Sequence, residues 1–161
     1  MQITALDYSN YLGIIGIGKI ENGNLKKNQP ITVIDRDGKI RNEKISKIMV
    51  FQGLSQIDVN EASCGDIVAL NGLGDLKISD TICDIDKIQK MPNLLIDEPT
   101  LSMVFQVNDS PLSGSDGKFI TRRNLKDRLN KELKTNIALK VEVTQDADKF
   151  KVSGRGELHL S

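Results

Sequence analysis

The first half of the chain consists of short apolar stretches separated by turns that contain glycine. Apolar residues concentrate at 13–20, 31–34, 45–51, 66–70 and 80–85, and the stretches between them are polar. None of these stretches sustains a helical period of 3.6 residues over three turns, whereas several alternate with the two-residue period of a strand. Many short strands joined by regular turns predict a small antiparallel barrel or sandwich.

Two dipeptides mark turns within this strand-rich half. Asn22-Gly23 lies between two apolar segments, which predicts a β-hairpin at that point. Asp37-Gly38 lies between the segments at 31–34 and 40–50, and it suits a turn that needs a positive φ.

The pattern changes after Asp86. Residues 87–98 have no clean period, and prolines 92 and 99 interrupt the stretch. Such a stretch predicts a linker that crosses the surface between two domains. The expected organisation is therefore a barrel over 1–86, a linker over 87–98 and a second domain over 99–161.

The second domain is predicted to mix strands with one helix. Residues 100–107 alternate as a half-buried strand, and residues 136–143 and 148–154 do the same. Between them, leucines 125, 129 and 133 form one apolar stripe of a helix for which Thr121 is the predicted N-cap. The order β-α-β-β is the start of a ferredoxin-like unit, which needs one more helix and strand to close. We therefore expect this chain to be a piece of a longer protein.

Composition is ordinary for a soluble globular protein, but the charge is unevenly distributed. Of the 161 residues, 39% are hydrophobic and 27% charged, and the formal net charge is zero. Residues 55–86 nevertheless carry a net charge of −6, and residues 118–134 carry +5. The basic segment favours a polyanionic partner, although two differently solvated faces would give the same pattern.

Residues 13–20, GIIGIGKI, imitate the phosphate-binding pattern G-x-x-x-x-G-K-[ST] at seven of its eight positions. The eighth position is Ile20, which has no hydroxyl for a magnesium ion. A working loop also leads into a helix, whereas ENGNLKKNQP follows Ile20 and carries a turn and a proline. We interpret Gly13, Gly16 and Gly18 as positions where a barrel strand bends or another backbone approaches, rather than as a nucleotide site.

The remaining candidate chemistry is sparse. His159 is the only histidine, and Cys64 and Cys83 are expected to be buried free thiols of a reducing compartment. No run approaches the roughly 18 apolar residues of a membrane span, and no signal peptide pattern opens the chain. We assign no catalytic, cofactor-binding or metal-binding residue, and we expect a cytoplasmic protein.

Basic residues around the predicted helix are the candidate functional site. Lysine and arginine side chains beside a glycine-rich loop can bind a phosphate backbone without reading its bases. The residues that we predict to contact RNA or the ribosome are Lys118, Arg122, Arg123, Lys126, Arg155 and His159. A solvated helix face would explain most of the same residues.

Several motifs resemble translational GTPases. The stretch GIIGIGKIENGNLKKNQPI, followed by VNEASCGDIVALNGLGDLKISDTICD, resembles the second domain of that family, a small antiparallel barrel. GRGELHL is shared in form with elongation factor G, whereas the runs NDSPLSG and GKFITRRNL resemble the third domain of the TypA/BipA subgroup. The resemblance covers nearly the whole chain.

This resemblance implies a fold, a partner and a parent activity. It implies an all-β, small antiparallel barrel of the translation-factor domain II type, followed by a truncated α+β ferredoxin-like domain III. In that family GTP and Mg²⁺ belong to an N-terminal GTPase domain, so this chain would be a non-catalytic part that contacts that domain, ribosomal RNA and ribosomal proteins. Members act on the bacterial ribosome in translation, stress response or ribosome assembly.

Three alternatives stay open on the sequence. One is the corresponding part of an elongation factor G-like or LepA-like GTPase, and another is a free-standing RNA-binding adaptor. The third is a nucleotide enzyme that uses Gly13 to Lys19.

Overall fold

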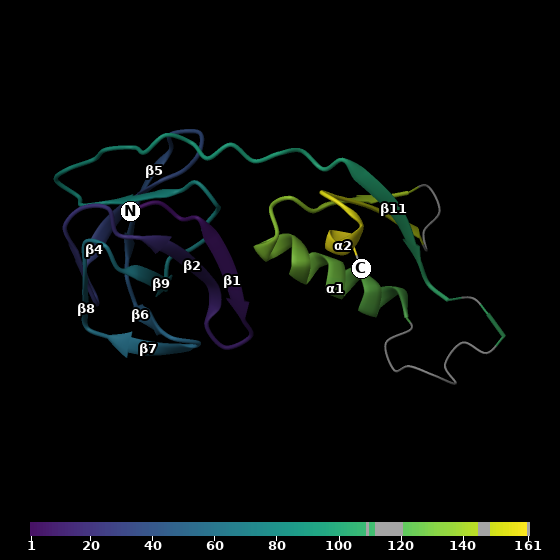
Figure 1. Ribbon diagram of the computed structural model, residues 1–161, viewed down its shortest axis with the longest axis horizontal. Coiled ribbons are helices and arrows are strands. Elements are labelled where there is room, and N and C mark those ends of the chain that lie inside the picture. The colour runs from purple at the N-terminus through teal and green to yellow at the C-terminus, as the bar shows by residue number, and fades with distance from the viewer. Residues whose placement is uncertain (109, 112–120, 145–148, 161) are drawn as a thin grey trace. The chain divides into compact units, whose positions relative to one another are not determined.

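The computed structural model describes residues 1–108, 110–111, 121–144 and 149–160. Its chain divides into two compact units, Met1–Leu94 and Leu95–Ser161 (Figure 1). Each unit has a hydrophobic core of its own. None of the described helices is both long and apolar enough to cross a bilayer.

The first unit is built from ten short strands in three antiparallel sheets. One sheet has the order β1-β2-β9-β6-β7, the second β10-β4-β5, and the third β3-β8. The strands are β1 (Ala5–Ser9), β2 (Gly13–Lys19), β3 (Asn24–Lys26), β4 (Pro30–Ile34), β5 (Ile40–Lys44), β6 (Lys47–Gln52), β7 (Ser55–Val59), β8 (Glu61–Ser63), β9 (Ile67–Asn71) and β10 (Thr81–Cys83).

The core of this unit is almost entirely aliphatic, as the scarcity of aromatic residues requires. Ile31, Ile45, Ile48 and Leu70 are fully buried at its centre. The N-terminal residues complete the enclosure, because Gln2 bridges to Thr81 and the amide of Ile3 donates to the carbonyl of Asp80 at 2.8 Å. The predicted antiparallel barrel is therefore confirmed.

The two predicted turns have different outcomes. Gly38 has φ +88° and joins β4 to β5 in a hairpin, as predicted. Gly23 also has a positive φ, but the hairpin predicted there is wrong, because β2 pairs with β1 and β9 while β3 pairs with β8. The turn carries the chain from one sheet to another instead of reversing it within a sheet.

The first part of the predicted linker over 87–98 is hydrogen-bonded to the barrel. Residues up to Leu94 belong to the first compact unit. The amides of Met91 and Leu94 donate to the hydroxyls of Thr81 and Ser79. Five residues, 95–99, separate Leu94 from Thr100, whose amide donates to the carbonyl of Gly154 in the second unit.

The described residues of the second unit form a three-stranded antiparallel sheet and two helices. Its sheet has the order β11-β13-β12, and the order along the chain is the predicted β-α-β-β. Phe150 and Val152 of β13 pack with Leu129 and Leu160 from the two helices to form its core. The elements are β11 (Leu101–Gln106), α1 (Arg122–Thr135), β12 (Lys140–Val143), β13 (Lys149–Gly154) and α2 (Glu157–Leu160).

Candidate functional site

The stretch that imitates a phosphate loop is strand β2. Its residues 13–17 pair with β1, and residues 16–19 pair with β9, so the backbone is committed to sheet ladders on both sides. No helix follows, because Ile20 is buried and its amide donates to the carbonyl of Asp66. An anion needs several free amides at a helix N-terminus, and this strand does not provide them.

The glycines of β2 have a steric reason. A Cβ atom on Gly18 would collide with the backbone carbonyl oxygen of Gln2. A Cβ on Gly16 would lie 2.6 Å from a methyl of Leu76 and 2.9 Å from a methyl of Ile3. The prediction that another backbone approaches is therefore confirmed at Gly18, whereas the neighbours of Gly16 are side chains and Gly13 has a positive φ of +77° with no atom within 4 Å.

Helix α1 begins as the sequence predicts. Thr121 is the N-cap, and its hydroxyl accepts a hydrogen bond from the amide of Asn124. Leu129 is buried and Leu125 packs on the same core, whereas Leu133 at the end of the stripe is 38% exposed. The leucine stripe therefore fixes which side of the helix faces solvent.

The solvent-facing side of α1 is strongly basic. The helix carries six basic and two acidic residues, a net charge of +4. Both acids have basic neighbours one turn earlier, with Arg123 Nε 3.9 Å from Asp127 and Arg128 Nη1 2.6 Å from Glu132. The basic side chains are all exposed, and they are Arg122, Arg123, Lys126, Arg128, Lys131 and Lys134. We call these six residues the basic strip.

The turn that links β13 to α2 contains the other predicted site residues. The amide of Arg155 donates to Nδ1 of His159 at 3.0 Å, and Nε2 of His159 lies 2.6 Å from the side-chain amide of Asn136. Since Nδ1 accepts a hydrogen bond, the neutral ring carries its proton on Nε2. Asn136 must then present its oxygen to the ring, with the amide group turned by 180°.

This arrangement gives His159 a structural task. Asn136 is the C-cap of α1, so the imidazole ties the end of that helix to the turn that carries Arg155. Gly154 leaves room for the ring, because a Cβ there would lie 2.7 Å from Nδ1. The motif GRGELHL is therefore a packed turn in which both ring nitrogens are used internally.

The structure separates the predicted site residues into two groups. Arg122, Arg123 and Lys126 lie in the first two turns of α1, whereas Arg155 and His159 lie beside its C-cap. A helix of 14 residues is roughly 20 Å long at 1.5 Å per residue. The predicted Lys118 lies outside the described residues.

Sequence reasoning left three members of the basic strip out of the candidate site. Arg128, Lys131 and Lys134 continue the positive charge along α1 toward its C-terminal end. The helical period already places them on the polar side, so the pattern contained the signal that was needed.

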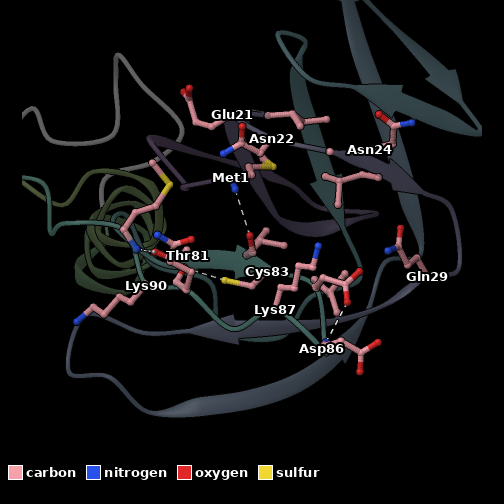
Figure 2. Close-up of a pocket in the computed structure, with 18 of the residues that line it drawn as sticks. Met1, Glu21, Asn22, Asn24, Gln29, Thr81, Cys83, Asp86, Lys87 and Lys90 are labelled. Carbon is pink, nitrogen blue, oxygen red and sulfur yellow. Dashed lines mark hydrogen bonds between the residues drawn. The ribbon is translucent and has the colours of Figure 1, made fainter.

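A pocket of about 890 Å³ in the first unit was not predicted from the sequence (Figure 2). Its apolar lining includes Ile20, Leu25 and Ile82, and Glu21 and Lys87 are among its charged groups. The lining comes from segments about 60 residues apart in sequence, 20–31 and 81–92, so no local motif could reveal it.

The cysteines correct one expectation. Both thiols are free, but Cys64 is exposed and Cys83 is half-buried, so the prediction that they are buried is wrong. Their thiols donate to the carbonyls of Glu21 and Gln89, respectively. Among the described residues, no cluster of three histidine, cysteine or acidic side chains could hold a metal ion.

Comparison with known proteins identifies relatives of both units. Residues 13–83 match the family described as Elongation factor Tu domain 2. A crystal structure from Thermus thermophilus aligns with 99% of this chain and 22% of its own, with a TM-score of 0.69 and 18% sequence identity, a likeness that concerns the fold alone.

Sequence similarity to curated proteins extends over all 161 residues. The chain is 58% identical to the Large ribosomal subunit assembly factor BipA of Salmonella typhimurium, 56% identical to that of Escherichia coli K12 and 53% identical to that of Haemophilus influenzae. It spans 26% of the length of each of these relatives. With more than half of its residues identical to theirs from end to end, the chain matches one segment of these BipA proteins over its whole length.

Proposed function

We propose that this chain is the part of a TypA/BipA-like GTPase that docks on the ribosome and transmits the nucleotide state of another domain. The observation that carries the proposal is its identity of 52–58% over its whole length with proteins named Large ribosomal subunit assembly factor BipA. Identity with those proteins favours this interpretation over a part of an elongation factor G-like or LepA-like GTPase.

The basic strip is the proposed RNA contact. Six exposed cations lie along roughly 20 Å of helix α1, and each of the two acids is next to an arginine. Such a surface suits the phosphate backbone, which supplies affinity without base specificity. Lys118, which precedes α1 in sequence, is proposed to add to it.

Arg155 and His159 are proposed to act together at the other end of the helix. Arg155 is exposed and offers its guanidinium to phosphate, whereas His159 accepts the Arg155 amide through Nδ1. His159 therefore contributes chiefly by holding the turn in place.

Chemistry is proposed to reside elsewhere in the parent protein. We infer that GTP and Mg²⁺ bind to an N-terminal GTPase domain, which contacts this chain and hydrolyses GTP. The role of β2 in two sheet ladders supports this division, because its amides are not free to bind phosphate. A ribosomal partner implies a cytoplasmic location.

Charge reversal in the basic strip tests the RNA contact. Arg122→Glu with Arg123→Glu, introduced into the full-length protein, should weaken co-sedimentation with ribosomes. If two phosphate contacts are lost, the slope of log affinity against log salt concentration should fall by roughly 1.5.

The matched control reverses two exposed lysines of the first unit, Lys27→Glu with Lys44→Glu, which changes the net charge by the same amount. The control should bind like the parent protein. Equal losses in both variants would show that only net charge matters and would contradict a localised contact, as would undiminished binding of the Arg122 and Arg123 variant.

A further inference from the structure

Residues 89–94, which we call the strap, lie on the barrel without joining any sheet. Gln2 Nε2 donates to the carbonyl of Pro92 at 2.8 Å, and the amides of Met91 and Leu94 donate to hydroxyls at 3.2 and 2.9 Å. Every hydrogen bond between the strap and the rest of the described barrel uses at least one side-chain atom. The strap can therefore detach without breaking a backbone ladder.

The groups that hold the strap are buried, which distinguishes them from ordinary surface contacts. The exposed fractions of Gln2, Ser79 and Thr81 are 7%, 0% and 1%. A buried hydroxyl or amide is costly unless it has a partner, and the strap supplies the partners here.

Ser79 has a strained backbone conformation, and its hydrogen bond to the strap gives a reason for a serine at this position. Its φ is +83°, a conformation that glycine adopts easily and that is strained for a residue with a side chain. Glycine would remove the strain but also the hydroxyl that accepts the Leu94 amide. A serine at this position indicates that holding the strap matters more than relaxing the backbone.

Two further bonds fasten the strap from the outside. Lys90 Nζ and Asn93 Nδ2 both donate to the backbone carbonyl of Arg36, at 2.7 and 3.3 Å. The carbonyl lies beyond β4, so the strap is tied to two separate places on the barrel. Because the same short segment is bonded at both places, we expect it to attach and detach as one unit.

We propose that the strap is a releasable clamp that sets the length of free chain between the two compact units. With the strap attached, only residues 95–99 are free, and they span at most about 18 Å. With the strap released, the free chain runs over 84–99 and spans at most about 58 Å. The clamp thus switches the second unit between a short and a long tether.

Amide hydrogen exchange on the 161-residue chain tests whether the strap behaves as one unit. Thr81→Val removes the acceptor for Met91 while keeping the shape of the side chain. This variant should speed exchange at least tenfold at Met91 and also at Leu94, which has a different acceptor. The amide of Ile3, which donates to Asp80 within the barrel, should keep its protection.

The matched control is Thr32→Val. Thr32 is equally buried and lies in the strand that pairs with β10, but its hydroxyl bonds to Asn42 instead of the strap. It should leave Met91 and Leu94 unchanged. If Thr81→Val destabilises the whole barrel, Lys90→Ala with Asn93→Ala removes only the exposed bonds to Arg36 and should give the same acceleration at both amides.

Tether length is measured by ¹⁵N relaxation. Releasing the strap should shorten the rotational correlation time of each unit, because a longer tether lets the units tumble more independently. Acceleration at Met91 alone would overturn the strap as a single unit. Faster exchange at both amides with unchanged correlation times would overturn the control of tether length.

Discussion

At the scale of single residues, some glycines are required because any side chain at their position would collide with a neighbouring group. Gly18 admits the backbone of Gln2, and Gly154 admits the imidazole of His159. In both cases the missing side chain allows another group to approach closely. Gly18 therefore acts through packing, although the glycine spacing in β2 imitates a phosphate loop.

Gly18→Ala should destabilise the first unit by about 1–3 kcal/mol, because the new methyl group meets backbone atoms that cannot rotate away. Urea denaturation followed by circular dichroism measures the change.

Gly74→Ala is the matched control, since its Cβ would meet only the end of the Glu43 side chain at 3.2 Å. It should change the free energy of unfolding by less than about 0.5 kcal/mol. Equal effects of the two substitutions would refute close backbone packing at Gly18.

Asp80 is the buried acid of the barrel. Its side chain is fully buried, and Oδ2 accepts hydrogen bonds from the Lys77 amide at 2.9 Å and from Arg41 Nη2 at 3.2 Å. Oδ1 has no partner among the described residues. Burial raises the pKa of this carboxyl above its ordinary value, and the Lys77 amide and the Arg41 charge oppose the rise only in part.

Because the pKa of Asp80 is raised in the folded state, ionisation of its carboxyl group destabilises the folded protein. The folded protein binds this proton more tightly than the unfolded chain, so the contribution of Asp80 to stability falls as pH rises from the unfolded pKa of about 3.9 through the folded pKa. Asp80→Asn removes the titration. The unfolding free energy of the variant minus that of the parent should therefore increase with pH above about 4.

Asp35 is an internal contrast for this measurement. A hydrogen bond from the Lys39 amide is the main cause that lowers the pKa of the exposed Asp35 carboxyl. Its contribution is present above the unfolded pKa and is lost as pH falls through the folded pKa. Asp35→Asn should therefore show the opposite pH slope, and the same slope in both variants would reject the assignment for Asp80.

At the scale of elements, the sequence predicts the strands, turns and helix ends that depend on neighbouring residues. The barrel strands, the Gly38 hairpin and the Thr121 cap of α1 follow from alternation, turn residues and capping, all of which depend on near neighbours. The sequence also predicts that no helix begins after Lys19, because a turn and a proline follow.

Contacts between residues far apart in the sequence could not be predicted from local patterns. The Gly23 turn was expected to form a hairpin, but β8 is the partner of β3. The RNA contact of His159 stays a prediction, but nothing in the local sequence shows that its ring bonds to Asn136. The strap falls within the stretch that was predicted to be a linker. The local sequence does not show that its amides donate to Ser79 and Thr81, which lie 10 to 15 residues earlier.

At the scale of the whole molecule, the two units differ in the size of their cores. Thirteen buried residues form the main core of the first unit, whereas the described residues of the second unit contribute four buried residues to its core. Small cores leave little reserve of stability, so we expect the second unit to unfold under milder conditions than the first.

Phe150→Ala tests the independence of the two cores. The side chain is 2% exposed and packs in the second core, and its loss should cost about 3–5 kcal/mol, enough to unfold that unit. Amide spectra should lose the dispersed signals of the second unit and retain those of the barrel. Loss of both sets of signals would mean that the barrel depends on the second core.

The pairing of the N-terminal segment with residues around Asp80 also has a temporal consequence. Ile3 exchanges backbone hydrogen bonds with Ser79 and Asp80, which lie more than 70 residues later in the chain. At about 5–20 residues per second, translation needs roughly 4–16 s to reach those partners after Ile3. During that interval the nascent chain can already pair strands β1 to β9, as in the hairpins β4–β5 and β6–β7, whereas Gln2 and Ile3 still lack their partners at residues 79–81.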